Sequence, residues 1–185
     1  MNEAMWALGR GSGVVALVLL TASLWLGIVT RSGRPLPGLP RFSVTLVHRN
    51  LALLSVVFVG LHILTLLADP YAKLTALDTV VPFLGTTKPF WLGLGTVAVD
   101  LMLAVVLTAL LRRWIGRRVF KAVHWASYAM WPVAIAHTLG TGTDASAGWL
   151  LLLSGACLLV VVIAVLWRLS ARFVESAAAR RGELS

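Results

Sequence analysis

Residues 46–67 read LVHRNLALLSVVFVGLHILTLL and hold two histidines, His48 and His62, in a mostly apolar run. The run is long enough to cross a bilayer, which takes about 20 apolar residues in a helix. A polar ring in lipid is unfavourable, so such residues usually bind something or hydrogen-bond to a neighbouring helix. The stretch therefore predicts a membrane helix whose two histidines have a specific role.

The composition of the whole chain agrees with a membrane protein. Of its 185 residues, 59% are hydrophobic and 12% are charged, and the mean hydropathy is +0.90. The formal net charge of +9 comes from basic residues that lie between apolar runs, so it indicates membrane topology and contact with lipid rather than a nucleic-acid partner. The single cysteine, Cys157, excludes an internal disulfide and a cysteine-based metal motif.

The apolar runs predict an all-α integral membrane helical bundle. Five transmembrane helices are expected, at about residues 11–30, 43–68, 90–111, 119–139 and 147–168. Thirteen Arg and Lys residues fall on one side of this arrangement and three on the other. The positive-inside rule then places the N-terminus outside and the C-terminus in the cytoplasm. We expect residues 1–170 to form the transmembrane domain and residues 171–185 to be a cytoplasmic tail.

The other two histidines, His124 and His137, fall in the fourth predicted span. Spans two and four run in the same direction, so His48 and His124 share the cytoplasmic depth while His62 and His137 share the outer depth. Fourteen helical residues correspond to roughly 21 Å and thirteen to roughly 20 Å. Histidine is a usual axial ligand of haem iron. The pattern predicts two b haems stacked across the bilayer, each held by two histidines.

The two predicted spans differ in whether their two histidines lie on the same face of the helix. On an ideal helix, fourteen residues return His62 to within about 40° of the face of His48, but thirteen residues leave His137 about 140° from His124. Pro132 lies between the latter two and removes a backbone N–H. We therefore expect a kink or a local rewinding of the helix near Pro132.

The segments HRNLALLSVVFVGLH and HWASYAMWPVAIAH, with histidine spacings of 14 and 13, resemble the haem helices of the ferric reductase-like transmembrane family. This superfamily includes ferric reductases, NADPH oxidases and the haem-binding membrane subunit of a periplasmic methionine sulfoxide reductase system. The resemblance covers roughly residues 8–170, and the GRGSG and GTD segments are similar to actinobacterial members. It implies electron transfer through two b haems, with ligand pairs His48 and His124, and His62 and His137.

The resemblance also bears on redox partners. The chain has no glycine-rich dinucleotide fingerprint, and its C-terminal segment is too short for an FAD or nicotinamide-binding domain. A separate flavoprotein or a quinol is therefore the expected electron donor. An extracytoplasmic (periplasmic) redox protein or ferric iron is the expected acceptor. The chain is then a candidate haem-binding membrane subunit of an oxidoreductase, and whether it is itself an enzyme stays open.

Two charged residues add to the candidate site. Arg49, beside His48, is a candidate contact for a haem propionate because arginine pairs with carboxylates in a two-pronged geometry, although topology alone also explains it. Asp100 is the only acid deep within a span, and we expect it to hydrogen-bond to a neighbouring helix or to take part in proton movement.

Two other functions compete with electron transfer. The intramembrane histidines and Asp100 would suit a proton or metal-ion transporter or channel, because ionisable residues mark such pathways. The histidines cluster at two depths with an apolar stretch between them, which favours haem over a relay. A plain membrane anchor for a soluble subunit is the third hypothesis, and in it the histidines would be replaceable.

Overall fold

The computed structural model describes residues 3–33, 36–38, 40–141, 147–171, 173 and 175. The regular structure in these ranges is helical and carries no β-sheet. Its elements are α1 (Glu3–Ser32), α2 (Arg41–Ala68), the short 3₁₀ helices η1 (Pro70–Ala72) and η2 (Leu77–Thr79), α3 (Pro89–Leu110), α4 (Arg112–His124), α5 (Ser127–Thr141) and α6 (Gly148–Leu169). The predicted all-helical membrane bundle is confirmed.

Four of these helices, α1, α2, α3 and α6, are long and apolar enough to cross a membrane. The fifth predicted span, residues 119–139, is divided between the end of α4 and α5. Helix α5 has 15 residues, which correspond to about 22 Å of helix. The expected count of five is therefore close, with four full-length spans and one shorter helix inside the bundle.

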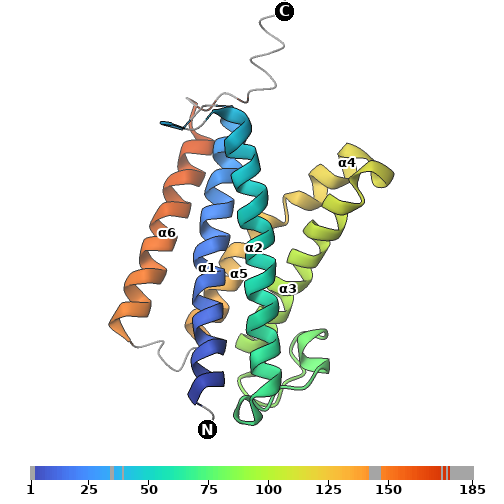
Figure 1. The fold of residues 1–185 in the computed structure, drawn as a ribbon, viewed down its shortest axis with the longest axis vertical. Helices are drawn as coiled ribbons and strands as arrows, with labels where there is room; N and C mark the ends of the chain where they lie inside the picture. The colour runs from blue at the N-terminus through green and yellow to red at the C-terminus, as the bar shows by residue number, and fades with distance from the viewer. Residues whose placement is uncertain are drawn as a thin grey trace, which may run out of the picture.

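The long helices α1, α2 and α6 lie side by side, α5 crosses behind them, and α3 and α4 lean away from the bundle (Figure 1). Helices α1 and α2 are antiparallel and pack along their length, while α3 packs mainly on α5. The start of α1 and the end of α6 lie at opposite ends of the molecule. The basic α3–α4 turn lies at the same end as the end of α6, which agrees with the predicted cytoplasmic side.

A buried cluster fixes the short helix α5 in the centre of the bundle. Its members come from α1, α5 and α6 and are Leu17, Trp131, Ile135, Cys157 and Val161. The indole Nε1 of Trp131 donates a hydrogen bond of 2.9 Å to Thr21 Oγ1, at a buried position. Because the indole N–H finds this partner, the large ring can be buried between helices without an unsatisfied donor.

Helix α4 ends at His124, and a short turn separates it from α5. The amides of Trp125 and Ala126 bond to carbonyls three residues back, at 3.3 and 2.8 Å, which is the pattern of a 3₁₀ turn. Pro132 lies further on, inside α5. The helix break between the two histidines is thus at residues 125–126, a position that the sequence did not indicate, while Pro132 lies within α5. It places His124 and His137 on two different helices, so the 140° phase of one ideal helix no longer applies.

A loop between α2 and α3 closes the outer end of the bundle. The carboxylate of Asp78 accepts hydrogen bonds from the backbone N–H and the hydroxyl of Thr75, at 2.9 and 2.8 Å. These bonds stabilise the charged form and hold the pKa of Asp78 below its ordinary value of 3.8. The Thr96 hydroxyl of α3 donates to the carbonyl oxygen of Asp78 at 2.7 Å and ties the loop to the bundle.

Candidate cofactor-binding site

The structure brings the four histidines together in the two pairs expected from their depths. The ring centroids of His48 and His124 are 6.3 Å apart, and those of His62 and His137 are 6.4 Å apart. The two rings of each pair are nearly perpendicular, with interplanar angles of 86° and 83°. Each pair joins α2 to the α4–α5 segment, at opposite ends of the bundle.

The separation within each pair suits a metal ion between the rings. A metal–imidazole nitrogen bond is about 2 Å, so a central ion places the two ring centroids about 6 Å apart. Among the described residues no group of three or more His, Cys, Asp or Glu side chains could hold a metal ion. A pair of imidazoles is too few for a bare structural zinc ion, but it completes the coordination of an iron whose other ligands come from a macrocycle.

Three of the four imidazoles are fixed by backbone carbonyls. The Nδ1 atom of each lies within hydrogen-bond distance of one carbonyl oxygen: His48 with Ser23 at 2.9 Å, His62 with Gly9 at 2.6 Å, and His137 with Trp91 at 2.9 Å. Because a carbonyl can only accept, Nδ1 must carry the proton and donate. The lone pair is then on Nε2, and the ring is oriented as metal-binding histidines generally are.

A glycine follows each of these carbonyls by four residues. A Cβ atom built at Gly13 would lie 2.9 Å from the ring of His62, one at Gly27 would lie 3.3 Å from His48, and one at Gly95 would lie 2.6 Å from His137. In a helix the Cβ of residue i+4 tilts back over the carbonyl of residue i, so glycine leaves that carbonyl open to a third group. We call each such pair a carbonyl–glycine anchor: Gly9 with Gly13, Ser23 with Gly27, and Trp91 with Gly95.

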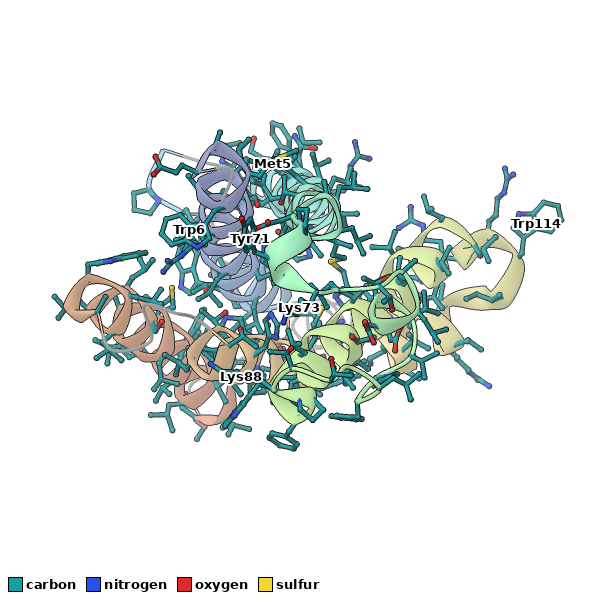
Figure 2. The ribbon with its side chains drawn as sticks, turned by 90° about the horizontal axis from the view of Figure 1, so that it is seen from below. Met5, Trp6, Tyr71, Lys73, Lys88 and Trp114 are labelled. Carbon is teal, nitrogen blue, oxygen red and sulfur yellow. The ribbon has the colours of Figure 1, made fainter. Side chains whose placement is uncertain are left out.

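The outer histidine pair opens into a cavity of about 560 Å³, which both His62 and His137 line. This volume is within the range of about 300–1,000 Å³ that is usual for small-molecule and cofactor sites. Figure 2 looks onto this end of the molecule, where Trp6, Tyr71 and Lys88, all of which line the cavity, come from separate segments.

A family model described as the ferric reductase like transmembrane component matches residues 12–135. The chain belongs to the ferric reductase-like transmembrane family. No curated protein and no solved structure matches it. The matched segment contains three of the four histidines, and His137 lies two residues beyond its end. Together with the four membrane-spanning helices, the family makes this chain a multi-pass membrane protein.

The residues of this ferric reductase-like domain fit a haem group. The two histidine pairs have the separation that axial ligation requires, and three rings already present Nε2. Two cations that suit haem carboxylates line the outer cavity. They are Arg10, whose guanidinium lies 4.3 Å from the ring centroid of Trp6, and Lys88, whose Nζ donates to the Gly140 carbonyl at 3.2 Å.

At the level of the domain that the sequence predicts to be cytoplasmic, arginine is present on two helices. Arg49, predicted from sequence, is exposed on α2. Arg168 of α6 has a side chain that is only 10% exposed, with its guanidinium 4.9 Å from the ring centroid of Trp125 and 5.6 Å from that of Tyr128. In the sequence, Arg168 is only one of the thirteen basic residues on the predicted cytoplasmic side, because nothing in the pattern shows that α6 brings it beside the residues that follow His124.

Asp100 lies apart from the histidines in this domain. It is exposed on α3, it does not line the cavity, and it makes no hydrogen bond or ion pair with the described part of the chain. The expected bond to a neighbouring helix is therefore not found within these residues. A relay through Asp100 and the histidines also lacks the contiguity that such pathways need.

Proposed function

We propose that this chain is a membrane b-type cytochrome that passes electrons across the bilayer through two haems. The observation that carries the proposal is the two histidine pairs, whose ring centroids are 6.3 and 6.4 Å apart at two depths of the bundle. Family membership supports the same assignment. Haem b supplies a one-electron iron couple, and two axial histidines per iron favour electron transfer over substrate binding.

In this proposal the chain itself holds, orients and isolates the two redox centres. His48 and His124 bind the cytoplasmic haem, and His62 and His137 bind the outer haem. Carbonyl–glycine anchors fix the orientation of the rings and raise the basicity of the ligands. Apolar side chains around the sites lower the local dielectric and thereby tune the reduction potentials.

The charged groups of the chain provide contacts for the haem propionates. We assign Arg10 and Lys88 to the outer haem, because both line the outer cavity. Arg49 and Arg168 are assigned to the cytoplasmic haem, because they lie on α2 and α6 near the corresponding end of the bundle. Arginine favours such carboxylates through its two-pronged donor geometry.

Redox partners complete the proposed pathway. We propose a separate flavoprotein or a membrane quinol as the donor, and an extracytoplasmic redox protein or ferric iron as the acceptor. The chain then acts as the haem-binding membrane part of an oxidoreductase. Electrons move outward through the bilayer while the chemical conversion takes place at the partner or at the edge of the outer haem.

The test is the absorption spectrum of the purified protein in detergent, oxidised and dithionite-reduced, with haem quantified per chain. We expect sharp low-spin b-type bands and about two haems per chain, because each pair forms one bis-histidine site. His62→Ala and His48→Ala should each lower the content to about one haem. Asp100→Asn is the control, and it should leave both haems in place because Asp100 lies outside the site.

The competing functions predict different results. A colourless protein from haem-replete cells would contradict the electron-transfer proposal and would favour a relay or an anchor. If proton or metal-ion flux into vesicles then depended on Asp100, the transporter hypothesis would replace the electron-transfer proposal.

A further inference from the structure

One of the four imidazoles differs from the other three in its surroundings. Nδ1 of His124 is buried and has no hydrogen-bond partner among the described residues. Gly13, Gly27 and Gly95 each lie against one of the other three histidines. The cytoplasmic pair therefore has one carbonyl–glycine anchor, on His48, and the outer pair has two.

His124 also differs from the other three histidines in its position in the chain. It is the last residue of α4, directly before the 3₁₀ turn at residues 125–126. The other three histidines lie inside continuous helices that pack against α1 or α3. Its ring is close to Phe120 of its own helix, at a centroid distance of 5.2 Å, and an aromatic ring offers no acceptor comparable to a carbonyl.

We propose that His124 is an exchangeable ligand, so that the cytoplasmic iron binds a small neutral molecule such as carbon monoxide while the outer iron does not. This inference rests on the proposed dihaem function. An imidazole that donates from Nδ1 to a carbonyl is a stronger and better oriented ligand, and loss of such a partner typically weakens metal binding about 10–100-fold. His124 has no such partner among the described residues, so its bond to a haem iron would be the weakest of the four.

The exchange is a simple substitution at iron. With haem bound, the His124 ring nitrogen would give up its position on the reduced iron, and carbon monoxide would bind through its carbon in that position. No electron or proton is transferred. The released ring would remain beside Phe120, which it already contacts, and would rebind when carbon monoxide is removed, so the exchange should be reversible.

The experiment is a carbon monoxide titration of the dithionite-reduced protein, after two haems per chain have been established. We expect close to half of the haem to shift to the carbon monoxide-bound spectrum, with the other half unchanged. The double variant His62→Ala/His137→Ala, which keeps only the cytoplasmic site, should bind carbon monoxide. The double variant His48→Ala/His124→Ala, which keeps only the outer site, should not.

A second pair of variants keeps all four histidines and tests the anchor directly. Gly95→Ala places a Cβ atom 2.6 Å from the His137 ring and disturbs its bond to the Trp91 carbonyl. We expect the carbon monoxide-reactive share to rise from half toward all of the haem. Gly11→Ala adds a Cβ atom with nothing within 4 Å and should leave the share at half.

Two results would overturn the inference while leaving the dihaem function intact. One is a protein with two haems that binds no carbon monoxide, and the other is equal reaction at both sites in the wild-type protein. A purified protein without haem would contradict the proposed dihaem function and this inference together.

Discussion

Alanine replacement of the three anchor glycines provides a graded test of how the histidines are held. Ordinary van der Waals contact begins at 3.4 Å, so a Cβ atom at 2.6, 2.9 or 3.3 Å requires the facing ring to move by about 0.8 Å for Gly95, 0.5 Å for Gly13 and 0.1 Å for Gly27. A ring that is held at both nitrogens, by iron and by a carbonyl, cannot move by most of an ångström without weakening one of the two bonds.

We therefore expect a graded loss of haem affinity. Gly95→Ala should release the outer haem about 10–100-fold faster than the wild-type protein, which is the usual effect of losing a partner of a metal-binding histidine. Gly13→Ala should have a smaller effect on the same haem, and Gly27→Ala should be close to wild type. Alanine is a better helix former than glycine by about 1 kcal/mol, so a weaker helix would not explain the loss.

The assay is the rate of haem transfer to an excess of an apo-haemoprotein scavenger, followed by absorbance. Gly11→Ala, on the same helix as two of the anchors but with open space around it, is the matched control. Equal rates for Gly95→Ala and Gly11→Ala would refute the idea that these glycines make room for the ligands. Faster haem release from Gly27→Ala than from Gly95→Ala would refute the predicted order of the three variants.

Three further predictions concern single contacts. Trp131→Phe and Thr21→Val should each lower the free energy of unfolding in detergent by about 1 kcal/mol or more, because each removes one partner of a buried hydrogen bond, and the double variant should lose less than the sum of the two. Thr75→Val should raise the pKa of Asp78, measured by NMR titration. Because the pKa of Asp78 is depressed in the folded protein, the ionised carboxylate stabilises the fold above the ordinary value of 3.8, and this stabilisation is lost as the pH falls below that value. The free energy of unfolding of the variant should therefore depend less on pH in the acid range. The perpendicular rings of both histidine pairs should give a strongly anisotropic low-spin ferric EPR signal, and a signal typical of parallel rings would contradict the geometry.

The pairing of the histidines was predictable because depth in a membrane follows from position along a helix. His48 with His124 and His62 with His137 could be matched from their distance to the ends of the apolar runs alone. The relative direction of the His124 and His137 side chains was not predictable. It depends on the 3₁₀ turn at residues 125–126, where no proline or glycine signals a break.

The partners of the imidazoles were also missed, although a signal for two of them exists in the sequence. Gly13 and Gly27 are separated by fourteen residues, as His62 and His48 are, which is the pattern expected when two antiparallel helices meet at two points. The third anchor, at Gly95, has no counterpart of this kind near His124. Which carbonyl faces which ring depends on the packing of α1 and α3, and the order of residues alone does not contain it.

The two anchors on α1 have a consequence for how the length of this helix can vary. Ser23 and Gly9 meet histidines of α2 at two points, and the number of residues between them is the same on both helices. One extra residue between the anchors would move one of them by about 1.5 Å along the axis and turn it by about 100°, while the other stayed in place. Substitutions between the anchors keep this register, but insertions and deletions do not. The pairing of α1 with α2 thus fixes the number of residues between the two histidine levels, and with it the distance between the two proposed haems.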